Sequence, residues 1–324
     1  MTIIDAHTHV AGDHPDTLEF LERKGLHLLN ICVAESNESW CDQEGKPYRQ
    51  LAHAFPERYS WCTTFDLPTF QPDYIERVIE RLDRDFAAGA VACKVWKNVG
   101  MEVRNPKGDL VLVDDPLFEP IFAHLADIQK PLLMHIAEPL ACWLPLTHES
   151  PHRAYYLANP EWHMHGRSDM PSHATLIASR DAVLAKHPTL RVVGAHLGSL
   201  EHDVDAVAER LERYPNFAVD VSARLGDLMS QDGERVRAFF DTFADRILFG
   251  TDIVMRTPHA ELPANERARQ VATLEEAYSD HFRYFETDEE LSHGGVTSRG
   301  IHLDDHTLEK FYTSNARTWY QLGA

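Results

Sequence analysis

The sequence predicts an α/β fold, a (β/α)8 TIM barrel with long βα-loop insertions on its C-terminal face. Eight short apolar runs recur along the chain, as expected for strands buried on both faces of a parallel sheet. Segments with helical spacing separate these runs, and such an alternation over 324 residues is typical of this barrel. A doubly wound open sheet is the alternative, but no GxGxxG follows the first run and no P-loop occurs.

The predicted strands are residues 3–9, 28–34, 60–66, 90–96, 131–137, 190–196, 217–223 and 246–252. Apolar residues recur at helical spacing between them, with charged residues on the other face, for example in 74–89, 179–188 and 203–215. No internal repeat, low-complexity tract or linker suggests a second domain. We therefore predict one domain over residues 1–324.

Three connections are too long for ordinary βα loops, namely 97–115, 137–172 and 253–305. Each follows a predicted strand, so each is expected on the C-terminal face, where long loops commonly serve as lids or binding loops. The middle one is rich in aromatic residues and histidines, and its Trp162 is a candidate substrate contact. A solvent-exposed excursion or an oligomer contact is the alternative for that segment.

The composition limits the partners. Lys and Arg number 31 and Asp and Glu 51, which gives a net charge of −20 that repels nucleic acids and anionic membranes. We therefore expect a small-molecule substrate and no nucleic-acid or membrane partner, and the sequence leaves a homo-oligomer open. No basic segment or long apolar run suggests a signal peptide or a membrane span. The scattered cysteines, without CxxC spacing, indicate reduced thiols and a cytoplasmic location; they are Cys32, Cys41, Cys62, Cys93 and Cys142.

The first predicted strand, IIDAHTH, places polar residues at alternate positions. Because successive side chains of a strand point to opposite faces, Asp5, His7 and His9 are expected on one side. Taken alone, the two histidines could be a surface pair or a hydrogen-bonded pair in the core.

Polar residues also stand near the C-terminal ends of other predicted strands. In a barrel of parallel strands these ends meet at one rim. A structural histidine in the core explains one such position, but not four histidines and an aspartate placed alike. The residues at these ends are His7, His9, Lys94, His135, His196 and Asp252.

Imidazole and carboxylate groups without a thiolate suit a divalent ion such as Zn²⁺, Mn²⁺ or Fe²⁺. His7 and His9 form a paired clamp, which His135 and Asp252 complete to a set of four ligands. A catalytic site of this kind leaves a position for water or a substrate oxygen. Asp5 either orients a ligand histidine or caps buried backbone amides.

The chain resembles the amidohydrolase superfamily, and more closely its branch that includes aminocarboxymuconate-semialdehyde decarboxylase. The resemblance extends over nearly the whole chain and rests on DAHTHV, PLLMHI, VVGAHLGS, ILFGTD and the terminal LEKFYTSNARTWY, which looks like a helix typical of the group. It implies that His7, His9, His135 and Asp252 hold one metal ion, with Zn²⁺ the expected metal. It also implies that His196 contacts the substrate or the metal-bound water.

The resemblance leaves the role of Lys94 open. In binuclear members of the superfamily a lysine on the fourth strand is carboxylated and bridges two metals, whereas in the mononuclear branch a lysine is often present without that role. The local VACKVW looks more like the second case. A positive charge that faces a substrate carboxylate, or an internal ion pair, is then expected.

Other candidates lie near the same rim. Arg224 follows the seventh strand and could clamp a substrate carboxylate with Asp220 fixing it, or the two could form a structural ion pair. Glu138 and Glu201 are expected to act as carboxylates at helix N-termini. The HMHGR run, residues 163–167, repeats the HxH spacing, but its position in a loop favours a part of the lid over a second metal site.

The function predicted from these residues is metal-dependent hydrolysis of an amide, lactone or ester in a small carboxylated molecule, by a metal-activated water. Asp252 carries the proton, His196 stabilises the oxyanion or fixes the water, and Lys94, Arg224 and Trp162 bind substrate. A decarboxylase or hydratase using the same ion is the first alternative. The second is a non-catalytic protein that binds a metal or another ligand, against which the retained Asp252 argues.

Overall fold

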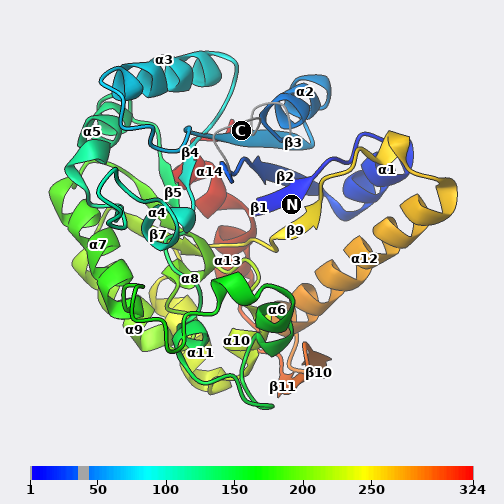
Figure 1. Cartoon of the computed structure of the whole chain (residues 1–324). Coiled ribbons are helices and arrows are strands. Elements are labelled where there is room, and N and C mark those ends of the chain that lie inside the picture. The colour runs from blue at the N-terminus through cyan, green and yellow to red at the C-terminus, as the bar shows by residue number, and fades with distance from the viewer. Residues whose placement is uncertain (1, 36–43, 324) are drawn as a thin grey trace.

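The computed structural model describes residues 2–35 and 44–323, and its centre is a sheet of nine parallel strands (Figure 1). Their order is β8-β7-β6-β5-β4-β3-β2-β1-β9, so the first eight are neighbours in the order of the sequence. The strands are β1 (Ile3–Val10), β2 (Leu26–Ile31), β3 (Tyr59–Thr64), β4 (Cys93–Val95), β5 (Leu132–Met134), β6 (Val192–Gly194), β7 (Phe217–Asp220), β8 (Ile247–Leu248) and β9 (Ile253–Met255). Each of the eight predicted strands is confirmed, whereas β9 was not predicted.

The sheet closes into a barrel because the segment that begins with β8 lies beside β1. The amide of Ala6 donates to the carbonyl of Phe249 at 2.9 Å, and the amide of Asp252 donates to the carbonyl of His7 at 2.8 Å. Beyond this point β9 pairs with the end of β1. The predicted (β/α)8 barrel is confirmed, and its closure brings Asp252 next to His7.

Helices surround the strands (Figure 1). The longer ones are α1 (Pro15–Lys24), α2 (Lys46–Ala54), α3 (Tyr74–Ala87), α5 (Glu119–Asp127), α7 (His173–Lys186), α9 (Val204–Arg213), α11 (Gly233–Thr242) and α12 (Ala264–Glu286). Shorter helices are α4 (Asn98–Met101), α6 (Arg153–Ala158), α8 (Ala195–Gly198), α10 (Leu225–Met229), α13 (Asp305–Glu309) and α14 (Asn315–Tyr320).

Local sequence explains where these helices begin and which face they bury. The helix α9 begins after Asp203, whose carboxylate accepts from the amide of Asp205 as an N-cap. Its buried residues, Val204, Val207 and Leu211, recur at positions i, i+3 and i+7 and form one apolar face.

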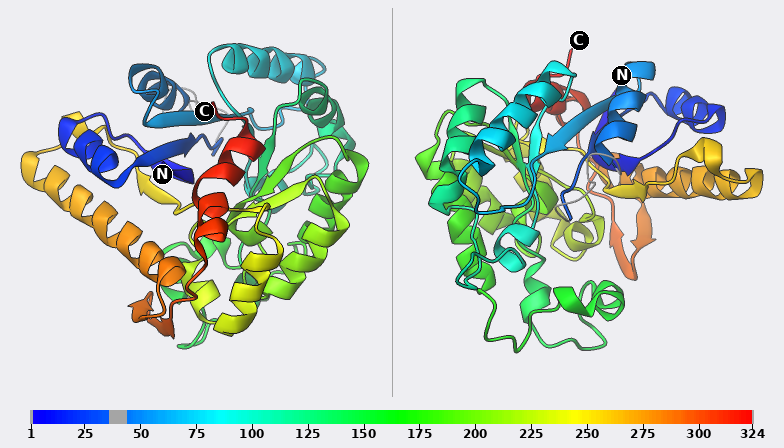
Figure 2. Two further views of the ribbon diagram at one scale, coloured as in Figure 1. Left: turned by 180° about the vertical axis from the view of Figure 1, so that it is seen from behind. Right: turned by 45° about the horizontal axis from the view of Figure 1, so that its top comes forward.

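The C-terminal segment covers the end of the barrel that lies opposite the C-terminal ends of the strands. Ala316, Trp319 and Tyr320 of α14 belong to one buried cluster with interior side chains of the strands, such as Ile4 and Leu133. Seen from behind in Figure 2, this segment crosses the barrel. The helical tail predicted from the sequence is therefore present, as α13, the π-helical turn η6 (Lys310–Ser314) and α14.

Strict alternation fails in β1, because its pairing with β2 shifts register between Asp5 and Thr8. Asp5 accepts a hydrogen bond at 2.7 Å from the hydroxyl of Tyr278, which lies on α12 in the outer layer. It also accepts from the amides of His7 and Thr251, and burial raises the pKa of its carboxyl to about 7. The prediction that Asp5 shares one face with the two histidines is wrong, and its role as a cap of buried amides is confirmed.

The three long connections differ in structure. Residues 97–115 contain α4 and an isolated bridge between Arg104 and Leu110. Residues 253–305 are mostly regular: they contain β9, α12 and a hairpin of β10 (Glu290–His293) and β11 (Val296–Arg299). Since α12 packs beside α1, with the rings of Tyr278 and Phe20 6.1 Å apart, it belongs to the outer helix layer and is no lid. Residues 137–172 contain α6 and short 3-10 turns, and we call them the lid segment from here on.

Cys32, Cys62, Cys93 and Cys142 are buried, and no disulfide joins cysteines within the described ranges. Cys41 lies outside those ranges. Within the same ranges, no helix combines the length and the apolar character needed to cross a bilayer.

The contact of α14 with the barrel interior predicts a strong dependence of stability on Trp319, which is 7% exposed. Trp319→Ala should lower the free energy of unfolding by about 3–5 kcal/mol, because it removes a large side chain and leaves a cavity. Leu157→Ala, at a side chain that is 56% exposed, is the control and should change it little. Urea unfolding measures the free energy of unfolding of both variants. If Trp319→Ala lowered it as little as the control does, α14 would not stabilise the barrel.

Candidate active site

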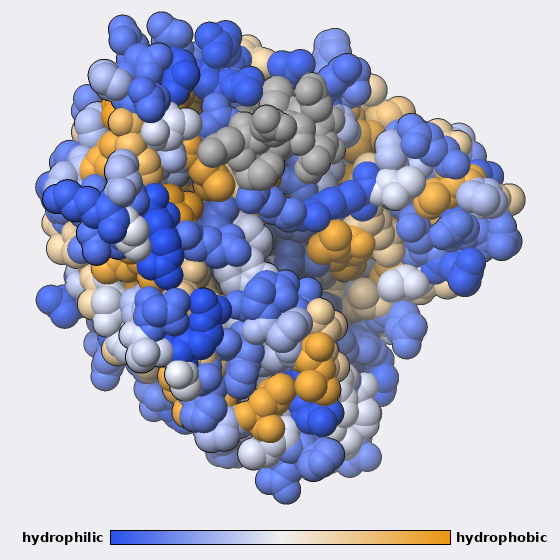
Figure 3. Space-filling model, viewed as in Figure 1, coloured by the Kyte–Doolittle hydropathy of each residue, from blue (hydrophilic) through white to orange (hydrophobic). Residues whose placement is uncertain are grey.

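A cavity of about 830 Å³ lies where the C-terminal ends of the strands meet. The face of the molecule in Figure 3 is hollowed near its centre. The side chains that line the cavity include all but one of the predicted site residues, the exception being the fully buried His7. Those that line it are His9, Lys94, His135, His196, Asp252, Arg224 and Trp162.

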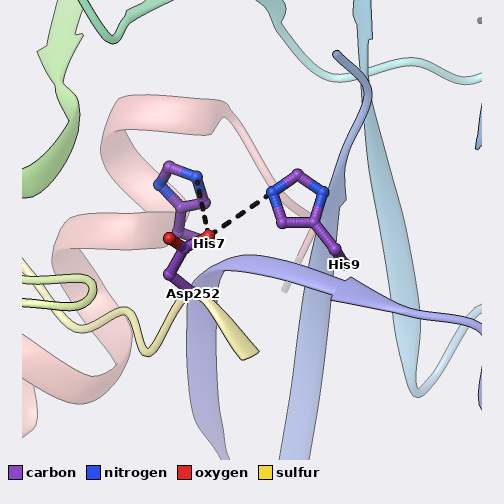
Figure 4. Close-up of side chains that lie close together, drawn as sticks. All are labelled: His7, His9 and Asp252. Atoms are coloured by element: carbon purple, nitrogen blue, oxygen red, sulfur yellow. Dashed lines mark ion pairs between the residues drawn. The ribbon is translucent and has the colours of Figure 1, made fainter. Parts of the chain in front are cut away.

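The side chains of His7, His9 and Asp252 converge (Figure 4), and two of them, His9 and Asp252, line the cavity. One carboxylate oxygen of Asp252, Oδ1, lies 3.7 Å from Nε2 of His7 and 3.4 Å from Nε2 of His9. Candidate ligand atoms of these three residues all lie within 4.8 Å of one another. Burial opposes ionisation, but the contacts with His9, His7 and His196 hold the pKa of Asp252 well below its usual value.

His7 is oriented by a buried carboxylate on β7. Its Nδ1 lies 2.9 Å from Oδ2 of Asp220 and 3.1 Å from the hydroxyl of Ser222. Because an ionised carboxylate only accepts, the proton of the neutral ring is assigned to Nδ1, and Nε2 is left as an acceptor. The lone pair of Nε2 of His7 therefore points to the site as an acceptor, the state that a carboxylate partner favours in metal-ligating histidines.

Asp220 joins several segments of the rim. Its carboxylate also accepts from the amides of His196, at 2.9 Å, and Ser222, at 3.1 Å. Burial opposes ionisation, yet the contacts with His7, His196 and Ser222 hold its pKa well below the usual value. The prediction that Asp220 fixes or pairs with Arg224 is wrong, because these contacts use it for the histidines instead.

His196 stands just after β6 with a left-handed backbone, φ 59° and ψ 50°. Its Nδ1 donates to the carbonyl oxygen of Ser222 at 2.8 Å, which leaves Nε2 as an acceptor. Burial lowers the pKa of the ring to about 3, so the ring is neutral near pH 7. In this state Nε2 can accept a hydrogen bond from water but cannot donate one to an oxyanion, which favours the water-fixing role among the two predicted for His196.

His135 follows β5 and lies beside His196, with the ring centroids 4.3 Å apart. It does not belong to the compact group of His7, His9 and Asp252. Its Nε2 is buried and has no hydrogen-bond partner among the described residues, and the same holds for Nδ1 of His9. A buried nitrogen without a partner is unfavourable, and a divalent ion bound by Nε2 of His135 would give that nitrogen a partner. The nitrogen and oxygen donors of the histidines and Asp252 fit such an ion.

Lys94 lies on β4 with Nζ 3.0 Å from Nε2 of His7. Burial lowers the pKa of its amine. Within the described ranges no carboxylate lies within 4.0 Å of Nζ, so the predicted internal ion pair is absent. The bridging role and the contact with a substrate carboxylate both stay predictions.

Arg224 is 7% exposed and lines the cavity. One guanidinium nitrogen donates to the carbonyl of Ala223 at 2.8 Å, and Nε is buried without a partner. No described carboxylate comes within 4.0 Å of it, so the structural ion pair considered from the sequence is absent. Burial disfavours its charge, but the surrounding Asp227, Glu201 and Glu138 raise the pKa of Arg224 above its usual value.

The two glutamates near the rim, Glu138 and Glu201, have different roles. Glu138 forms a buried ion pair with Lys97 and accepts from the hydroxyl of Tyr156 at 3.3 Å. Glu201 accepts from the amide of Leu140 at 3.0 Å. Leu140 is the first residue of the 3-10 turn η3 (Leu140–Trp143), so Glu201 is a carboxylate at a helix N-terminus, as predicted. Glu138 is used by Lys97 and Tyr156 instead, and the prediction is wrong for it.

The histidines of the HMHGR run contact the backbone of the lid segment. His163 bonds to the carbonyl of Leu144 at 3.1 Å, and His165 to that of Trp143 at the same distance. Neither belongs to a group of potential metal ligands within the described ranges. Their interpretation as part of the lid agrees with these contacts.

Three further residues were missed by sequence reasoning. Ser222 stands two positions after Asp220, so the same alternation that identified the histidines could have found it. Glu44 accepts from the amide of Val33 at 2.6 Å and lies 3.8 Å from Nδ1 of His9, but it comes from a connection without a recognisable pattern. Lys97 is buried beside Glu138, and nothing in the sequence distinguishes it from an exposed lysine.

Comparisons with known proteins agree with the barrel fold. Three solved structures share the fold at low identity. The 4-oxalomesaconate hydratase from Rhodopseudomonas palustris is 12% identical over 99% of this chain and 96% of that one, with a TM-score of 0.55. A dihydroxybenzoic acid decarboxylase from Polaromonas sp. JS666, with bound manganese and 2-nitroresorcinol, is 14% identical over 99% of this chain and 97% of that one (TM-score 0.54), and a probable 2-pyrone-4,6-dicarboxylic acid hydrolase from Acinetobacter baumannii, with citric acid bound, is 12% identical over 99% and 100% of the two chains (TM-score 0.52). No curated protein matches the chain in sequence.

A family model described as amidohydrolase matches residues 4–322. The match extends from β1, which carries the two histidines, to the end of α14. The chain belongs to the amidohydrolase family.

Proposed function

We propose that the protein is a metal-dependent hydrolase acting on a small molecule that carries a carboxylate and an amide, ester or lactone bond. One observation carries the proposal: Arg224, a buried cation that pairs with no carboxylate among the described residues, lines the same cavity as Asp252 and His9. A cation in this position suits a carboxylate on the substrate, since a guanidinium binds that group with two parallel hydrogen bonds.

His7, His9 and Asp252, with His135 at the neighbouring strand end, would hold the ion. A bound Zn²⁺, the metal we expect, would polarise a carbonyl group and acidify water at neutral pH. Mn²⁺ and Fe²⁺ suit the same nitrogen and oxygen donors.

The chain's own residues supply the proton transfers and the binding contacts. Asp252 is an anionic acceptor that can take a proton from the attacking water and return it to the leaving group. Nε2 of His196 is a second acceptor that can fix the water, because Nδ1 is occupied by the carbonyl of Ser222. Arg224, Lys94 and Trp162 would bind the substrate from the cavity wall.

A metal-dependent decarboxylase or hydratase is the second candidate. It is favoured by the decarboxylase and hydratase that share the fold, both named for acids as substrates. The same cavity would serve this reaction if Asp252 moved a proton to or from carbon instead of water.

Product analysis tests the proposal and separates the two candidates. Protein purified without chelator should contain one divalent ion per chain by elemental analysis. On a panel of small carboxylated amides, esters and lactones it should form one new carboxylate per turnover without releasing CO₂. Release of CO₂ from aromatic or unsaturated acids, or hydration of their double bonds, would instead support the second candidate. Absence of bound metal would contradict both.

Substitutions of Asp252 and His9 should separate catalysis from metal binding. Asp252→Asn should keep most of the metal, because three histidines remain, and should lower kcat by ~10²–10⁴, the usual contribution of general acid–base catalysis. His9→Ala should lose metal first, with activity partly restored by excess ion. Metal content and kcat are measured on the same samples. Near-normal turnover of metal-loaded Asp252→Asn would rule out this proton transfer.

Substitution of Arg224 tests the contact with the substrate carboxylate. Arg224→Gln should raise KM for a carboxylated substrate by roughly 10²-fold, because truncating one partner of a buried charge pair is costly. The same substrate with its carboxylate masked as a neutral amide is the control, and its KM should not distinguish the two proteins. Equal effects on both substrates would show that Arg224 does not bind the carboxylate.

A further inference from the structure

Lys97 is a buried cation at the cavity whose contacts differ from those of Arg224. It follows β4 at the barrel rim and is 4% exposed. Its ammonium group forms an ion pair with Glu138 and donates to the hydroxyl of Tyr155 at 3.0 Å. It also lies 3.9 Å from the centroid of the Trp162 ring.

These contacts use the whole ammonium group. A lysine has three N–H donors, and here a carboxylate, a hydroxyl and an aromatic face surround them. Nothing is left to bind a substrate anion, in contrast with Arg224, whose Nε is buried without a partner. Lys97 therefore acts on other side chains of the protein.

The side chains that Lys97 holds belong to the lid segment. Tyr155 and Trp162 lie in or beside its short helical turns, and both line the cavity. Trp162 also packs edge-on against Trp96, the residue that precedes Lys97, with the centroids 5.4 Å apart. The lid therefore meets the barrel rim at one cluster, in which a single cation contacts two of its aromatic residues.

We infer that Lys97 is a positioning residue that fastens the lid segment over the catalytic cavity. It does so through its ion pair with Glu138 and through Tyr155 and Trp162. By ordering these aromatic walls before substrate arrives, it lowers the entropy lost on binding and so strengthens substrate affinity. This role in affinity rests on the proposed function, whereas the fastening of the lid does not.

Hydrogen exchange on the full chain tests the fastening without any substrate. Lys97→Met keeps the apolar length of the side chain and removes its charge. We expect amides of residues 150–165 to exchange roughly tenfold faster or more in this variant, with α5 and α9 unchanged, because only a local opening is made easier. Lys97→Arg, which keeps the cation, should restore most of the protection.

Two further variants complete the test. Lys107→Met is the matched control, because Lys107 lies in the same connection and its side chain is exposed; it should leave the lid unchanged. Tyr155→Phe removes the hydroxyl that Lys97 contacts and should speed exchange in the lid even if Lys97→Met does not fold. An unchanged lid in both Lys97→Met and Tyr155→Phe, or equal acceleration over the whole chain, would overturn the inference.

Kinetics then test the effect on affinity. If the proposed function holds, Lys97→Met should raise KM about tenfold while kcat changes less than about threefold, since uniform binding is lost and proton transfer is not. A fall in kcat with unchanged KM would overturn the role in affinity. If no hydrolase activity is found at all, the exchange experiment still decides whether Lys97 fastens the lid.

Discussion

The contact between Asp220 and His7 determines how the floor of the cavity is arranged. The two side chains are fully buried and join strands that are not neighbours, because β8 lies between them. A buried carboxylate of this kind is stable only while its partners remain. Removing one partner lowers the free energy of unfolding by roughly 3–5 kcal/mol. Asp220 also accepts from the amide of His196, so one carboxylate sets the position of two histidines.

The backbone at the same rim is held in an uncommon conformation. His196 and Asp252 both have φ near +60°, at 59° and 60°. This region is unfavourable for residues other than glycine, although histidine and aspartate adopt it more readily than most. The amide of His196 is fixed by Asp220 and that of Asp252 by the carbonyl of His7. Buried hydrogen bonds thus stabilise the two residues that face the cavity with their functional groups.

Much of this arrangement followed from the sequence. His7, His9 and Asp252 could be brought together in advance because the ends of parallel strands meet at one rim. The side chain of Asp5 could not be placed, because a register shift within β1 turns it away from the two histidines. No residue type in the strand indicates this shift. The partner of Asp220 could not be read either, because nothing in its local sequence distinguishes a histidine across the rim from the nearby Arg224.

Helix α12 shows a related limit of sequence reasoning. The length of the connection 253–305 suggested an active-site loop. Its helix instead packs against α1, and the hydroxyl of its Tyr278 donates a hydrogen bond to Asp5. Length alone does not distinguish a lid from an outer helix that is followed by a hairpin. Lys97 is a further case, since burial of a lysine depends on a carboxylate and aromatic rings that lie far along the chain.

The attachment of the lid segment has a consequence for how such a protein can diverge. The side chains at the cavity floor are fixed by strand ends and by Asp220, whereas Tyr155 and Trp162 of the lid segment reach the rim through a small cluster around Lys97. Substitutions in the lid segment can therefore change the shape of the cavity wall while the side chains at the strand ends keep their positions. A barrel built in this way can change which molecules fit its cavity by substitutions in one segment, without rebuilding the cluster of His7, His9 and Asp252.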